Sequence, residues 1–76
     1  MEEFLALIAR RLVDRPDRVR VDSEEREQGI IFRLIVDPAD VGKVIGKQGR
    51  TAQALRTVMI AVAAREGKRA LLEIVQ

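Results

Sequence analysis

Residues 41–50 read Val-Gly-Lys-Val-Ile-Gly-Lys-Gln-Gly-Arg and hold two glycines in the spacing G-x-x-G. Helical apolar patterns flank residues 46–49, which predicts a loop between two helices. Because glycine has no side chain, a polymer backbone can approach such a loop closely. The loop leads into the N-terminus of the next helix, where free amides and the helix dipole favour an anion. The stretch therefore predicts a site for a phosphodiester backbone.

Basic residues gather around this loop. Residues 1–40 hold seven bases and ten acids, a net charge of −3, whereas residues 41–76 hold seven bases and two acids, a net charge of +5. The bases nearest the two glycines are Lys43, Lys47 and Arg50. Such asymmetry favours an anionic partner facing the second half. A helix whose solvent face happens to be basic remains the alternative on charge alone.

The flanking sequence predicts an α+β fold. Apolar residues at helical spacing predict helices over residues 2–13, 39–45 and 50–65, and β-branched runs predict strands over residues 18–26, 30–37 and 69–75. The first two strands form a hairpin that turns at Gly29, and the first is an edge strand because it is strongly polar. The order α-β-β-α-α-β suits a three-stranded sheet covered on one face by three helices.

The apolar stripes of two helices are predicted from their spacing. In the first helix the stripe is Phe4 or Leu5, then Ile8 and Leu12. In the long helix it is Leu55, Val58 or Met59, and Val62. These side chains are expected to face the sheet.

The composition excludes several functions. The 76 residues include no cysteine and no histidine, which removes disulfide frameworks, thiolate metal sites and the commonest general base. Gln48 follows Lys47 where a P-loop needs a hydroxyl, so a nucleotide site is not expected. Asp37 and Asp40 are expected to cap a helix rather than to bind a metal. No signal peptide or membrane span is evident, which predicts a cytoplasmic protein. The missing histidine and cysteine predict a non-catalytic protein without metal or cofactor.

The stretch DVGKVIGKQGRTAQALRTVM resembles the core of a KH domain, whose signature is a V-I-G-x-x-G loop between two helices. Only 11 residues follow Arg65, too few for the two strands of the eukaryotic-type order. The element order is similar to that of type II KH domains. Residues 1–76, with the loop at 46–49, are most similar to the small stand-alone bacterial KH proteins of the KhpA type.

The resemblance implies that the loop clamps about four nucleotides of single-stranded RNA. It assigns to RNA binding Gly42, Lys43, Val44, Ile45, Gly46, Lys47, Gln48, Gly49 and Arg50. Strand 30–37 is expected to line the groove through one of its two faces. One face carries Ile31, Arg33 and Ile35, and the other carries Ile30, Phe32 and Leu34. Arg33 is the favoured contact because it is a charge in an apolar strand, and single-stranded DNA remains an alternative ligand.

Ile60 and Ala64 lie off the apolar stripe of the long helix, which predicts a dimer interface there, and a wide core face that includes Ile60 is the alternative. The resemblance implies a homodimer, a heterodimer with a larger Jag (KhpB)-type KH protein, or both. It also implies a role as an RNA chaperone or post-transcriptional regulator. The alternative is a protein-interaction adaptor in which the KH fold is mainly a dimerisation scaffold.

Overall fold

A computed structural model describes residues 1–76 and has the predicted order of elements. The helices are α1 (Glu2–Leu12), α2 (Val41–Ile45) and α3 (Arg50–Ala64), and the strands are β1 (Arg20–Arg26), β2 (Gly29–Ile35) and β3 (Ala70–Val75). Short 3-10 turns occupy Pro16–Arg18, Pro38–Asp40 and Lys47–Gly49. The prediction of an α+β fold with three helices and three strands is confirmed.

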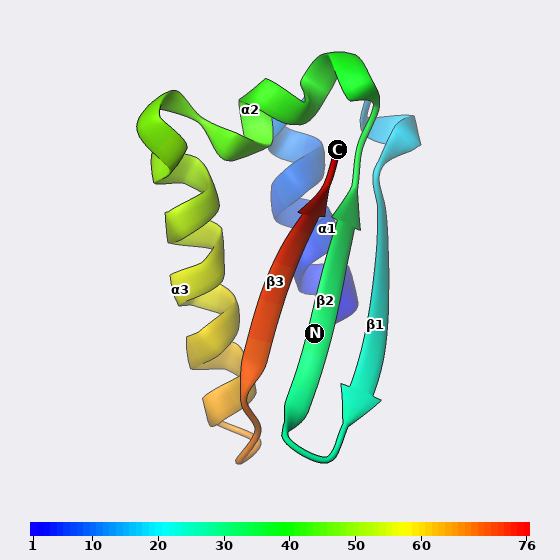
Figure 1. Ribbon diagram of the computed structural model, residues 1–76. Coiled ribbons are helices and arrows are strands. Elements are labelled where there is room, and N and C mark those ends of the chain that lie inside the picture. The colour runs from blue at the N-terminus through cyan, green and yellow to red at the C-terminus, as the bar shows by residue number, and fades with distance from the viewer.

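The three strands form one mixed sheet in the order β1-β2-β3 (Figure 1). β1 pairs antiparallel with β2 through the hairpin, and β3 pairs parallel with β2 on its other side. Gly29 closes the hairpin with φ of +152°, and a Cβ atom there would lie 2.7 Å from the Arg69 carbonyl oxygen. A glycine is therefore required where β3 begins beside β2.

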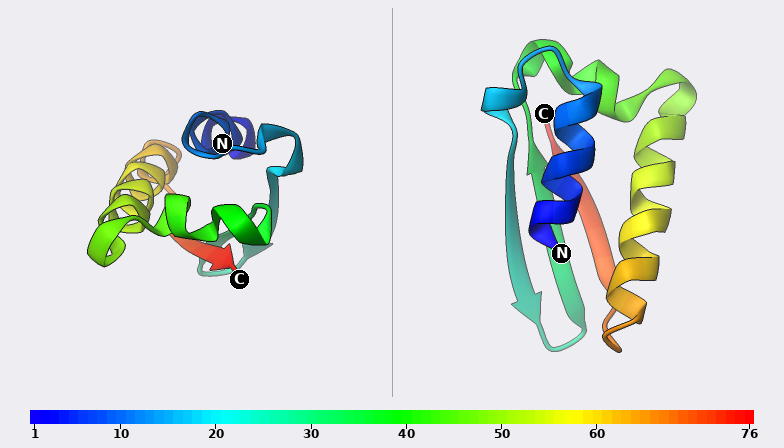
Figure 2. Two further views of the ribbon diagram at one scale, coloured as in Figure 1. Left: turned by 90° about the horizontal axis from the view of Figure 1, so that it is seen from above. Right: turned by 180° about the vertical axis from the view of Figure 1, so that it is seen from behind.

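The helices lie on one face of the sheet and leave the other open (Figure 2). Ile30, Phe32 and Leu34 point from β2 into the core and are almost completely buried. Leu72 of β3 joins them in the same apolar cluster, as do side chains of α1, α2 and α3. Burial of these side chains against the helices is the main source of stability in a domain of this size.

The predicted apolar stripes are confirmed in part in both long helices. The buried residues of α1 are Leu5, Ala6 and Ala9, whereas Phe4, Leu7 and Leu12 are 44%, 52% and 37% exposed. Leu5, one of the two alternatives for the start of the stripe, is thus confirmed as buried, Ile8 is half-buried against the core, and two alanines complete the buried face. The buried residues of α3 are Ala52, Leu55, Met59 and Ala63, and Val58 and Val62 are only half-buried.

The connection before α2 is held by two aspartates. Asp37 accepts a hydrogen bond from the Ala39 amide at 2.9 Å, with Pro38 in the first position of the turn, which confirms a capping role. Asp40 is completely buried, and its Oδ2 accepts a hydrogen bond from the Arg15 amide at 3.0 Å. The Arg15 guanidinium lies 3.8 Å from the other carboxylate oxygen. Asp40 thus fastens the α1–β1 connection to the start of α2.

Several boundaries differ from the predicted ones by one or two residues. Arg18 lies in a 3-10 turn that begins at Pro16, so β1 starts at Arg20 rather than at residue 18. The Asp37 turn ends β2 at Ile35 and delays α2 to Val41. None of the helices has the length and apolar character needed to cross a membrane.

Candidate nucleic-acid interface

The G-x-x-G stretch is a tight turn between α2 and α3 (Figure 1). Three of its four residues have positive φ: Gly46 at 77°, Gln48 at 58° and Gly49 at 74°. Side chains disfavour this left-handed region, and glycine adopts it at little cost. The turn is closed by hydrogen bonds from the Gly46 amide to Gly42 at 2.9 Å and from the Gly49 amide to Gly46 at 3.2 Å.

The two loop glycines are required for different reasons. A Cβ atom on Gly46 would lie 2.2 Å from Thr51 Oγ1 and 2.9 Å from the Thr51 amide nitrogen. A Cβ atom on Gly49 would meet nothing within 4 Å, so only its left-handed φ disfavours a side chain there. Thr51 is therefore part of the turn, although its role was not predicted from the sequence. A backbone clash of this kind is invisible before the turn is built.

The N-terminus of α3 is open to an anion. Gly49 is its N-cap residue, and no side chain accepts a hydrogen bond from the first turn. The first amides of a helix have no partner within it, and the helix dipole is positive at this end. These amides form a favourable place for a phosphate oxygen beside the bare backbone of the two glycines.

Two cations at the loop carry no ion pair within the chain. Lys47 and Arg50 are exposed, and neither takes part in any of the ion pairs of the structure. Lys43 Nζ lies 3.5 Å from Asp14 Oδ2, but both side chains are well exposed. Exposed pairs of this kind contribute little to stability. All three cations are thus accessible to a phosphate.

The predicted aliphatic wall beside the loop is only partly available. Val44 is completely buried and belongs to the hydrophobic core, which does not fit a contact with a ligand. Ile45 is half-buried and ends α2 next to Gly46. Gly42 is exposed on α2, and a Cβ atom there would meet nothing within 4 Å. Exposed surface along α2 therefore comes from Gly42, Lys43 and Ile45.

The two helices that flank the loop pack mainly against β3 and not against β2. Ile30, Phe32 and Leu34 are core residues, so that alternative for the groove is excluded by burial. Ile31, Arg33 and Ile35 alternate with them and therefore point to the open face of the sheet. Arg33 lies mid-strand there, and its guanidinium donates to Glu24 at 3.1 Å and lies 4.0 Å from Glu73. The hydrogen bond from Arg26, and to a smaller extent the one from Arg33, lower the pKa of Glu24 below its usual value.

The strand nearest the loop is β3, because both α2 and α3 pack against it. Two consecutive strands joined by a helical crossover usually lie side by side and parallel. β3 accordingly pairs with β2 and forms the edge of the sheet that α2 and α3 cover. Side chains of β3 were not among the predicted contacts. The crossover rule, applied to the connection between β2 and β3, is the signal that would have identified this strand.

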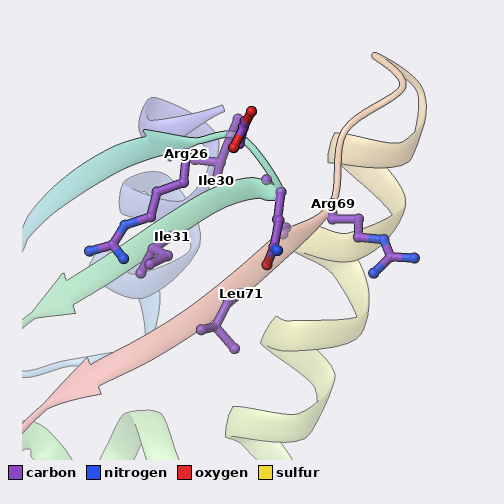
Figure 3. A pocket seen from close by; sticks show the side chains of 9 residues that line it. Arg26, Ile30, Ile31, Arg69 and Leu71 are labelled. Atoms are coloured by element: carbon purple, nitrogen blue, oxygen red, sulfur yellow. The ribbon is translucent and has the colours of Figure 1, made fainter.

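A hollow of the surface lies away from the loop. It sits between β2 and β3 at the hairpin end, with Ile31 and Leu71 along it and Arg26 and Arg69 at its sides (Figure 3). This end of the sheet is opposite to the G-x-x-G loop in Figures 1 and 2. Glu27 also lines the hollow, and Arg26 Nε lies 2.7 Å from Glu24 Oε2. The positive charge of the hollow is therefore partly neutralised. No group of three or more acidic side chains is arranged to hold a metal ion.

A G-x-x-G turn between two helices, set in the order α-β-β-α-α-β, defines a KH domain of type II. Residues 2–74 match the family described as KhpA/KhpB, KH domain. The chain belongs to this family, which is non-catalytic, as the missing histidine and cysteine predicted.

The similarity to individual relatives covers the full chain. A protein named RNA-binding protein KhpA from Clostridium acetobutylicum is 53% identical over 75 residues, which are 99% of this chain and 100% of the relative. A protein of the same name from Aquifex aeolicus is 49% identical over 76 residues, 100% of this chain and 96% of the relative. The one from Chlamydia pneumoniae is 47% identical over 76 residues, 100% and 97% of the two chains.

Proposed function

We propose that the chain binds single-stranded RNA by clamping its backbone at Gly46–Gly49. The observation that carries this proposal is the bare, left-handed turn placed directly before the uncapped N-terminus of α3. Amides and dipole orient a phosphate there, and Lys43, Lys47 and Arg50 add charge around it. The name of the relatives, RNA-binding protein KhpA, supports the same ligand.

Binding by one such domain is expected to be weak and tolerant of sequence. Phe32 is buried and Phe4 lies on α1, so no aromatic ring stands beside the loop to stack on a base. Phosphate contacts then supply much of the affinity. Three cations predict a slope of about −2 for the logarithm of the binding constant against that of the salt concentration, at about −0.7 per contact for single strands.

The double variant Lys47→Asp, Gln48→Asp tests the clamp. Both side chains are exposed, and aspartate tolerates the left-handed φ of residue 48, so the fold is expected to survive. Affinity for labelled single-stranded RNA should fall roughly tenfold or more, because two negative charges replace one positive charge at the phosphate site. Fluorescence polarisation at fixed salt measures this loss.

A matched control is available at the far end of the sheet. Gln28→Asp with Arg69→Asp makes the same change in net charge at two exposed positions of the hairpin end. This control should bind RNA nearly as the unchanged chain does. Equal binding by the loop variant and the unchanged chain would refute the clamp. A DNA strand of the same sequence, measured in parallel, decides between RNA and single-stranded DNA.

We propose further that the protein acts in the cytoplasm as an RNA chaperone or post-transcriptional regulator together with a partner. Ile60 is 52% exposed and Ala64 is also exposed, so α3 has an apolar surface outside the core. A homodimer, or a heterodimer with a larger Jag (KhpB)-type KH protein, would cover it. Ile60→Asp should leave a folded monomer by light scattering, and an unchanged dimer mass would remove this interface.

A protein-interaction adaptor is the second candidate function, favoured by the same exposed α3 surface. In that case the fold serves mainly as a dimerisation scaffold and RNA binding is incidental. The two candidates differ in the loop experiment, because an adaptor has no requirement for Lys47 or Gln48.

A further inference from the structure

The outer face of α1 carries an acid, a leucine and an arginine four residues apart. Glu3, Leu7 and Arg11 are all exposed, and Leu7 is 52% exposed. At 3.6 residues per turn these three form one stripe, and Leu7 points about 150° away from the middle of the buried face formed by Leu5, Ala6 and Ala9. The stripe therefore runs along the side of α1 that faces away from the sheet.

The charges of this stripe have no partner within the chain. Glu3, Arg10 and Arg11 take part in none of the ion pairs of the structure. The helix dipole favours acids at the start of a helix and bases at its end, which accounts for the order of the charges. It does not account for a large apolar side chain midway between them, or for the exposed Phe4 beside it.

The stripe is complementary to itself in one orientation. Glu3 and Arg11 each lie four residues, about 6 Å of helix rise, from Leu7. We propose that α1 packs antiparallel against α1 of a second copy of the chain, about a two-fold axis at Leu7. Glu3 of each copy then faces Arg11 of the other, and the two Leu7 side chains meet at the axis.

The flanking residues fit the same arrangement. Phe4 and Arg11 lie on the same flank of Leu7, three residues before it and four residues after it, so the axis brings Phe4 of one copy near Arg11 of the other, where a cation–π contact can form. A parallel arrangement would place Glu3 on Glu3 and Arg11 on Arg11. The charge pattern therefore selects the antiparallel, two-fold contact, in which both copies use the same surface.

The contact is expected to be weak. α1 has 11 residues and is about 16 Å long, and one helix pair of this length buries less surface than a standard stable interface. Association should therefore depend on concentration. It involves neither the G-x-x-G loop nor Ile60, so its success or failure is independent of the proposed function. Where both α1 and the α3 surface pair, each copy has two neighbours and the mass exceeds that of a dimer.

The absence of cysteine from the chain allows a direct test by disulfide trapping. For helix axes about 8–10 Å apart, the two Cα atoms at residue 7 would lie about 3–5 Å apart, within or near the range for a disulfide. Leu7→Cys should therefore form a covalent dimer under mild oxidation at least tenfold faster than Gln28→Cys. Gln28 is an exposed residue of the hairpin turn and reports random collision at the same concentration.

Charge exchange then tests the orientation. In the Leu7→Cys chain, Glu3→Arg alone and Arg11→Glu alone should each slow disulfide formation several-fold. The two together should restore the rate, because the partners are exchanged. If each change acted only by destabilising its own helix, the combined variant would be slower than either single variant, since both changes oppose the helix dipole. Circular dichroism checks that each variant keeps its helix.

Sedimentation equilibrium of the Ile60→Asp chain completes the test, because this substitution prevents pairing through the α3 surface. Above the concentration at which light scattering gives a monomer for this variant, the mean mass should rise with concentration, and adding Leu7→Asp should abolish the rise. The proposal is overturned by Leu7→Cys reacting no faster than Gln28→Cys, by failure of the combined charge exchange to restore the rate, or by a mass independent of concentration.

Discussion

Three glycines of residues 41–50 should respond very differently to alanine. Gly42 is exposed at an ordinary φ with open space around a Cβ atom, Gly49 has open space but φ of +74°, and Gly46 combines φ of +77° with a clash. Gly42→Ala should stabilise the fold by up to about 0.5–1 kcal/mol, because glycine loses more backbone entropy on folding. Gly49→Ala should cost about 1–2 kcal/mol for the left-handed conformation.

Gly46→Ala should be the most damaging of the three. It carries the same left-handed cost as Gly49→Ala, and its Cβ would also overlap Thr51 Oγ1, Thr51 Cβ and the Thr51 amide nitrogen. The last of these is backbone and cannot rotate away, so overpacking adds about 1–3 kcal/mol. The total is about 2–5 kcal/mol, a large share of the stability of a 76-residue domain. Thr51→Ala removes Oγ1 and the methyl group but keeps Cβ and the amide nitrogen, so it should recover only part of this loss of stability.

Urea denaturation measures these differences. The chain has no Trp or Tyr, so far-ultraviolet circular dichroism is the suitable signal. With a slope of about 1 kcal/mol per molar urea, a loss of 3 kcal/mol moves the midpoint by about 3 M. Gly46→Ala being no more costly than Gly49→Ala would refute the claim that Thr51 makes Gly46 obligatory.

Three further outcomes are expected. Gly42→Ala should keep the fold yet lower the affinity for single-stranded RNA in fluorescence polarisation. The added methyl group meets no atom of the chain but would obstruct the close approach of a ligand, and unchanged affinity would contradict this. Asp40→Ala should cost about 1–3 kcal/mol in urea denaturation, since it leaves the Arg15 amide without its partner, and Asp40→Asn, which keeps an acceptor, should cost less. The pKa of Glu24 is lowered first by the hydrogen bond from Arg26, so this pair stabilises the fold at neutral pH and is lost as the pH falls through the acid range. Arg26→Ala should raise the titration midpoint of Glu24 measured by NMR, and an unmoved midpoint would show that the pair does not form.

Much of the fold could be predicted from the sequence, because the local sequence patterns agree with the tertiary structure. The β-branched run at residues 30–37 predicted a buried strand, and β2 lies at the centre of the sheet. The strongly polar stretch at residues 18–26 predicted an edge strand, and β1 is one. Asp37 and Pro38 predicted a capped turn, which the hydrogen bond to Ala39 confirms. Each of these features depends on residues close together in the chain.

Errors arose where a choice depended on partners far along the chain. Large apolar residues were expected to define the buried face of α1, but among them only Leu5 is fully buried, Ala6 and Ala9 complete that face, and Leu12 lies outside it. Arg33 was expected beside the loop, but the parallel pairing of β3 with β2 puts another strand under α2 and α3. Helical spacing alone does not tell which of two apolar stripes meets the sheet.

The sequence by itself determined the G-x-x-G turn, the cations around it and the order of elements, because spacing, glycine content and charge are local properties. Only the tertiary structure decided why Gly46 tolerates no side chain, that Val44 is core, and that Arg33 points to the open face. These depend on where Thr51, the sheet and β3 lie relative to the turn. That placement is settled by burial of the whole core, which joins residues far apart in the chain.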